Sequence, residues 1–173
     1  MNFSIQAIIR GHVAPKHFLG CSKSLWNTGL TELKHRGNGR RESGAFLLGK
    51  NSNGVRTILR FLYYDDIDPY CLDRGYVHFN GAAYGLLWVI CRSSNLNVIG
   101  DIHTHPGYAI QSFSDRQNPM IAIKGHIALI VPRFAKQIVL QHELGIYEYA
   151  GEHRWKNHSG KNAARIFYIG RLG

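Results

Sequence analysis

The spacing of apolar residues predicts alternating helices and strands over most of the chain. Residues 2–10 alternate apolar and polar side chains, as a half-buried strand does. A helix is expected from Ser22 or Ser24 to about His35, because Leu and Trp residues recur there at near-helical spacing. Ser24 is the expected N-cap, and the Gly-Asn-Gly at 37–39 ends this helix.

Strands dominate the middle of the chain. Residues 42–49 and 55–64 predict two strands joined by a hairpin loop, Asn51-Ser52-Asn53-Gly54. Residues 80–92 predict a second helix with a broad apolar face, and residues 97–103 predict a strand rich in Val and Ile. Further strands are expected over 126–131, 144–149 and 166–169.

These elements alternate without a long regular βαβ repeat, which predicts the α+β class, a mixed three-layer α/β/α domain. A length of 173 residues fits one domain over 1–173. An apolar fraction of 45% with only 18% charged residues argues against a disordered chain. The apolar run over 86–91 is too short to cross a membrane, and no secretory signal is recognised, so a cytoplasmic location is expected.

The chain is strongly basic, with 21 Lys and Arg against 11 Asp and Glu and a formal charge of +10. This excess favours acidic partners, either nucleic acid or an acidic protein surface. A solvated basic face is the simpler interpretation, and nucleic acid is not an expected partner, because no RRM, KH or zinc-finger pattern is present. The cations form one cluster (Lys34, Arg36, Arg40 and Arg41) and a looser C-terminal series (Arg154, Lys156, Lys161, Arg165 and Arg171).

The three cysteines, Cys21, Cys71 and Cys91, are widely spaced and form no C-x-x-C pair. This argues against a disulfide framework and against a structural zinc site built from cysteines. Cys91 lies in an apolar stretch and is interpreted as a small buried hydrophobe. No neighbouring His marks any of the three as a catalytic thiol.

The clearest chemistry lies at the end of the strand predicted over 97–103. His103 and His105 are two residues apart, so on a strand both imidazoles project to the same side. Pro106 ends the strand, and Asp115 follows ten residues after His105. Two His and one carboxylate, with a fourth position for water, are the composition of a catalytic zinc site. Because a His-x-His pair alone is common on exposed strand ends, the prediction depends on the whole set.

The full pattern resembles the JAMM family of zinc metallopeptidases, also named MPN-plus. That family has a Glu that opens an apolar strand, then H-[ST]-H-P, then S-x-x-D. The corresponding segments are 42–49, which begins with Glu42, then His103-Thr104-His105-Pro106, and Ser112-Phe113-Ser114-Asp115. The order of the predicted elements also matches, and the resemblance covers residues 3 to 150.

Two features depart from the family pattern. Five residues, 107–111, separate the proline from Ser112, where six are usual. Ala45 stands where the family has glycine, which occurs here one place earlier as Gly44. Neither departure affects a predicted metal ligand. Ser112 is preferred to Ser114 because only Ser112 has the S-x-x-D spacing.

The resemblance implies an MPN fold of the cytidine-deaminase-like kind, with a curved central sheet flanked by helices. It implies that His103, His105 and Asp115 hold Zn²⁺, the single expected cofactor. It further implies that Glu42 takes a proton from the attacking water and that Ser112 donates a hydrogen bond to the oxyanion.

The resemblance also implies a substrate class: the enzyme cleaves after the C-terminal Gly of a ubiquitin-like protein or a conjugated protein tail. An extended tail can add as a strand beside the catalytic sheet, and a small residue lets the backbone approach the metal. Short stand-alone copies of the domain are similar to bacterial members from antiphage systems such as CBASS. Activating and conjugating enzymes of the ubiquitin type are therefore expected partners.

Two alternatives stay open. One is a JAMM peptidase that processes sulfur-carrier or other protein tails. The other is a basic, non-catalytic binding module in which the His pair is incidental. Metal analysis separates the second alternative from the peptidase.

Other polar residues have simpler interpretations. Asp101 shares a strand face with His103 and is either a partner for an imidazole or an ordinary strand-end residue. His78 and His126 are expected to be structural or exposed. The acidic run over 65–68 lacks the Gly and the later Glu of an EF-hand, so a solvated turn is expected.

Overall fold

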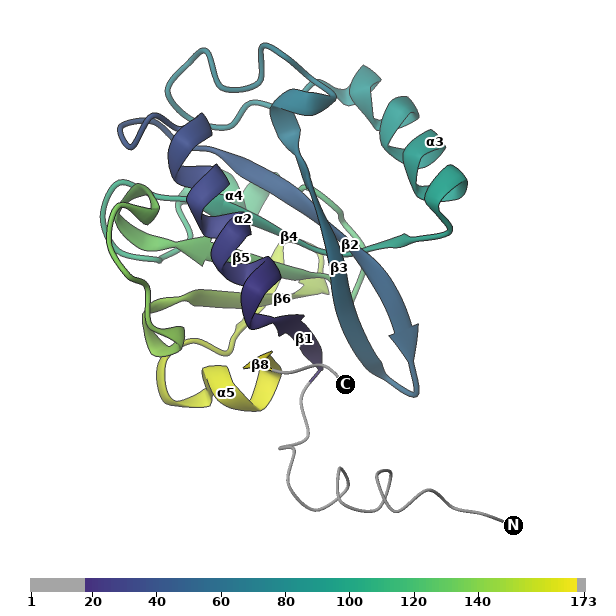
Figure 1. Ribbon diagram of the computed structural model, residues 1–173, viewed down its shortest axis with the longest axis vertical. Coiled ribbons are helices and arrows are strands. Elements are labelled where there is room, and N and C mark those ends of the chain that lie inside the picture. Colours follow the sequence, from purple (N-terminus) through teal and green to yellow (C-terminus); the bar gives the residue numbers. More distant parts are fainter. Residues whose placement is uncertain (1–17, 171–173) are drawn as a thin grey trace.

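The computed structural model describes residues 18–170, which form a curved mixed sheet with helices (Figure 1). The α+β class is confirmed. The sheet has the strand order β7-β6-β5-β4-β2-β3-β1-β8. Its strands are β1 (Leu19–Ser22), β2 (Gly44–Ser52), β3 (Val55–Tyr63), β4 (Asn97–Thr104), β5 (Ile127–Val131), β6 (Gly145–Gly151), β7 (Arg154–Asn157) and β8 (Phe167–Gly170).

The described α-helices are α2 (Lys23–Arg36), α3 (Tyr84–Ser94), α4 (Phe113–Gln117) and α5 (Ala163–Ile166). Short 3₁₀ turns connect several elements: η1 (Tyr64–Asp66), η2 (Gly81–Ala83), η3 (Pro132–Ala135), η4 (Gln141–Glu143) and η5 (Gly160–Asn162). Within residues 18–170, no helix has the length and apolar character needed to cross a membrane.

Apolar side chains form two buried clusters, one on each face of the sheet. Ala45 of β2 belongs to a cluster with Trp26 of α2, whereas Phe46 belongs to a second cluster with Leu87 of α3. Successive strand residues point to opposite faces, so β2 is buried on both sides. Figure 1 shows α2 lying across the strands and α3 standing apart from it, beside the β2–β3 hairpin.

The strand β4 lies in the middle of the sheet and carries the predicted ligands at its end. It pairs antiparallel with β2 and parallel with β5. The register places Gly44 opposite His103 and Phe46 opposite Asp101. A Cβ atom on Gly44 would collide with the ring of Tyr64 and with the backbone of β4. The glycine found one place earlier than the family pattern is therefore required by this close approach.

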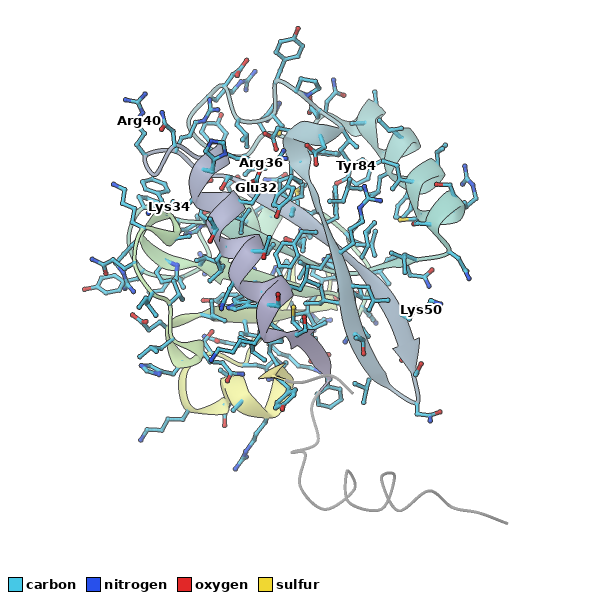
Figure 2. The ribbon with its side chains drawn as sticks, in the orientation of Figure 1. Glu32, Lys34, Arg36, Arg40, Lys50 and Tyr84 are labelled. Carbon is cyan, nitrogen blue, oxygen red and sulfur yellow. The ribbon has the colours of Figure 1, made fainter. Side chains whose placement is uncertain are left out.

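An ion-pair network joins α2 to the end of β3. Arg36 Nε lies 2.8 Å from Glu32 Oε1, and Arg36 Nη1 lies 2.8 Å from Asp65 Oδ1 and 2.6 Å from Asp66 Oδ1. Figure 2 shows Glu32 and Arg36 side by side on the helix. The expectation of a solvated acidic turn holds for Asp66, which is exposed, but is wrong for the other two carboxylates. Asp65 is half-buried and pairs with Arg36, and Asp68 is buried.

Most predicted elements are present, with shifted ends. The helix α2 is capped by Ser22, whose Oγ accepts a hydrogen bond from Leu25 N at 3.2 Å, so the prediction of Ser24 as N-cap is wrong. The helix expected over 80–92 consists of η2 followed by α3. The strand expected over 2–10 lies outside the described residues. The sequence pattern does not predict the elements β1, α4, α5 and β7, because four or five residues carry too little periodicity.

Candidate metal centre

His103 and His105 lie together at the end of β4. Their Nε2 atoms are 2.9 Å apart. Both residues are nearly buried, with an exposed fraction of 8% for His103 and 7% for His105. The strand ends at Thr104, and His105 N donates a hydrogen bond to Val131 O at 2.9 Å, which continues the pairing with β5 by one step. The alternation of side chains along an extended backbone therefore directs both rings to one point.

Asp115 reaches this point from α4. Ser112 Oγ accepts a hydrogen bond from Asp115 N at 3.1 Å, and Asp115 Oδ2 accepts one from Ser112 N at 2.6 Å. This reciprocal arrangement is a capping box, which requires the S-x-x-D spacing. The two carboxylate oxygens of Asp115 lie 3.6 Å from His103 Nε2 and 3.3 Å from His105 Nε2. The cap therefore orients the carboxylate toward both imidazoles.

The His103, His105 and Asp115 side chains fit a metal ion. Their ligand atoms all lie within 4.8 Å of one another. Tetrahedral zinc binds nitrogen and oxygen at about 2.0–2.2 Å, which separates the ligand atoms by about 3.3–3.6 Å. The separations of 2.9, 3.3 and 3.6 Å are close to this range. Within residues 18–170, no other group of His, Cys, Asp and Glu side chains meets this spacing.

The electrostatics of the group also suit a cation. Burial opposes the ionisation of Asp115, but hydrogen bonds with His103 and His105 hold the pKa of Asp115 well below its ordinary value. Burial lowers the pKa of His103, and the contact with Asp115 raises it, so that the net direction is upward. A metal ion and protons therefore compete for the same atoms, and metal affinity should fall as the pH falls.

Glu42 approaches the same point from the segment before β2. Its Oε1 atom lies 3.9 Å from His105 Nε2. Its Oε2 accepts a hydrogen bond from Val77 N at 3.3 Å, and its own backbone N donates to Gly75 O at 3.0 Å. The predicted strand over 42–49 begins only at Gly44, so Glu42 precedes the sheet and is oriented by the loop that faces it.

A pocket of about 640 Å³ opens beside these residues. Glu42, His103, Ser112 and Asp115 all contribute to its wall. Polar groups that converge in a pocket with apolar and aromatic walls are typical of a small-molecule or peptide site. The remaining wall includes Tyr64, Tyr76, Phe79, Tyr84, Met120 and Trp155.

A buried Asp–His pair also borders this pocket. Asp101 Oδ1 lies 2.6 Å from His126 Nε2, and the Tyr64 hydroxyl donates to Asp101 Oδ2 at 3.3 Å. The imidazole partner of Asp101 is therefore His126 and not one of the predicted ligands. Asp101 and His103 both line the pocket, which agrees with their expected common strand face. His78 is exposed at the pocket wall, as a surface residue.

The cysteines have the properties of buried, unreactive side chains. Cys21 and Cys71 are 0% and 1% exposed, and burial raises the pKa of each thiol to about 12. Burial also raises the pKa of Cys91. We expect no thiol of the native protein to react rapidly with Ellman's reagent at mildly alkaline pH, and all three to react in guanidinium. Fast labelling of one native thiol would contradict this and reopen the question of a catalytic cysteine.

Comparison with known proteins agrees with the fold class. No family model matches the chain. The backbone is similar to the solution structure of protein DSY2949 from Desulfitobacterium hafniense, with a TM-score of 0.62 and 15% sequence identity. The match covers 89% of this chain and 94% of that chain. At this identity the similarity concerns the fold alone, so the function has to be argued from the side chains of the pocket.

Proposed function

We propose that this chain is a zinc-dependent peptidase or isopeptidase of the JAMM type, with an MPN fold. The supporting observation is that His103, His105 and Asp115 come together with Glu42 beside them, from three separate segments, and that Glu42, His103 and Asp115 line one pocket. An incidental His pair in a basic binding module has no need for a capped aspartate and a glutamate at the same point. The geometry therefore favours a hydrolase over the non-catalytic alternative.

In the proposed reaction, the metal ligands and Glu42 have separate roles. His103, His105 and Asp115 would hold Zn²⁺, which when bound supplies Lewis acidity and leaves a position for water. Glu42 accepts a proton from the attacking water and returns it to the leaving amine as the C–N bond breaks. Oε2 of Glu42 already accepts a hydrogen bond from Val77 N. Oε1, which lies nearer His105, is therefore the atom placed to take the proton.

Ser112 has two parts in this proposal. Its Oγ accepts the hydrogen bond from Asp115 N, which holds the S-x-x-D turn in place. The hydroxyl hydrogen stays available and can be donated to the oxyanion of the tetrahedral intermediate. Ser112 is exposed and lines the pocket, so a substrate carbonyl has access to it.

The proposed substrate is an extended tail that ends in glycine, from a ubiquitin-like protein or a conjugated protein. His103 and His105 are nearly buried, so the substrate backbone has to come close to reach them, and glycine permits that approach. Because β4 lies between β2 and β5, the tail has no free edge of β4 to pair with. Segment 76–79, which lines the pocket, is the backbone against which it would lie.

The proposed biological setting follows from the same resemblance. We place the enzyme in a bacterial antiphage system, in the cytoplasm, together with activating and conjugating enzymes of the ubiquitin type. Nucleic acid is not a proposed partner.

The test is cleavage of a ubiquitin-like protein fused through its terminal Gly to a reporter protein. The purified chain should cleave this fusion, lose activity after chelation and recover it when Zn²⁺ is added. A matched fusion with Val in place of the terminal Gly should resist cleavage. A zinc-loaded chain that cleaves no fusion of this class would contradict the proposed substrate.

A further inference from the structure

A second, smaller pocket of about 290 Å³ adjoins the first, and we name it the side pocket. The two pockets share Gln111 and Trp155 in their walls. Trp155 of β7 donates from Nε1 to Arg116 O of α4 at 3.1 Å. This bond joins the edge strand β7 to α4, the helix that carries Asp115. The side pocket therefore lies next to the candidate metal centre.

Arg116 gives the side pocket an uncompensated positive charge. Among residues 18–170, no Asp or Glu forms an ion pair with its guanidinium, and all acidic residues of the chain lie in that range. The preceding Asp115 faces the two imidazoles instead. The side-pocket wall also contains His153 but neither Asp nor Glu. An anion is therefore the ligand that this wall favours.

Gln111 supplies a second donor. It is only 8% exposed, and its backbone N donates to the Tyr147 hydroxyl at 3.4 Å. Its side-chain amide has no hydrogen-bond partner among the described residues, yet it is not fully enclosed, so it opens to the two pockets that Gln111 lines. A nearly buried amide without a protein partner is typical of a position that a ligand or water satisfies.

We propose that the side pocket binds the carboxylate side chain of an Asp or Glu close to the scissile bond of the substrate. The Arg116 guanidinium and the Gln111 amide both donate to carboxylate oxygens, and guanidinium is well suited to this planar group. Trp155 and Ile110 offer apolar contact to the methylene part of the side chain. This inference rests on the proposed function, because it takes the bound peptide to be a substrate tail.

The experiment uses matched labelled peptides that end in a glycine amide, so that no free terminal carboxylate is present. At each position before the glycine, one peptide carries Glu and its partner carries Gln. Binding is measured by fluorescence anisotropy to the chain with Glu42→Gln, which keeps the peptides intact. We expect one position at which Glu binds about tenfold more tightly than Gln. The preference should vanish with Arg116→Gln, and Arg116→Glu should favour Lys at the same position.

Arg92→Gln is the matched control, because Arg92 is an exposed arginine of α3 that lines neither pocket. The Glu preference should persist in this variant. Equal binding of every Glu and Gln pair, a preference that survives Arg116→Gln, or one that Arg92→Gln also removes would each overturn the assignment. Cleavage of the same peptides by the wild-type chain is scored separately. Retained preference without any cleavage would contradict the proposed function and leave the carboxylate site standing.

Discussion

Replacement of Glu42 by Gln is expected to slow cleavage of the ubiquitin-like fusion by about 10²–10⁴-fold, whereas zinc content stays at about one per chain. The amide keeps the shape of the side chain but cannot accept a proton from water. The carboxylate of Glu42 lies outside the group of three close ligand atoms, so its neutralisation should leave metal binding intact. Rates are measured on the fusion, and zinc is measured by metal analysis of the same preparation.

The matched control is Glu32→Gln, because Glu32 lies on α2 (Figure 2) and does not line the pocket. This variant should cleave at the wild-type rate. A Glu42→Gln enzyme with wild-type activity would remove Glu42 as the proton acceptor. Loss of zinc from Glu42→Gln would instead assign the residue to metal binding.

Replacement of His103 by Ala is expected to weaken zinc binding by more than about a hundredfold and to abolish cleavage. Mutation of groups that only orient a ligand commonly costs 10–100-fold in metal affinity, so removal of a ligand should cost more. Metal that binds the native state also stabilises it, so chelation should lower the Tm of the wild-type chain and change the variant little. Zinc content and Tm, with and without chelator, check both expectations.

His142→Ala controls for loss of an imidazole as such, because His142 is exposed and lies outside the pocket. It should keep the zinc content and the chelator-dependent Tm of the wild-type chain. If His103→Ala retained one zinc per chain with wild-type affinity, the assignment of the His103, His105 and Asp115 centre would be wrong.

The sequence was sufficient to place the central chemistry because that chemistry depends on local geometry. His103 and His105 face one point as a result of strand alternation, which holds for any extended segment. The Ser112 and Asp115 spacing is likewise local, since a capping box closes within four residues. Periodicity does not predict the short helix α4, although the capping pair Ser112 and Asp115 marks its start.

The contacts that the sequence left open join residues that are far apart along the chain. Asp101 was assigned a strand face but not a partner, because His126 reaches it only through the parallel pairing of β4 with β5. In the same way, the sequence does not predict the ion pairs of Asp65 and Asp66 with Arg36, because the approach of Arg36 depends on how α2 packs on the sheet.

The sequence by itself determined the α+β class, most of the longer elements and the three side chains that could hold a metal ion, because periodicity and spacing act over a few residues. Only the tertiary structure decided that Glu42 stands before its strand, held by the loop at Gly75 and Val77. It also decided that Arg116 faces a pocket without a carboxylate partner. The charges that surround a side chain are set by the order of strands in the sheet, which local patterns do not specify.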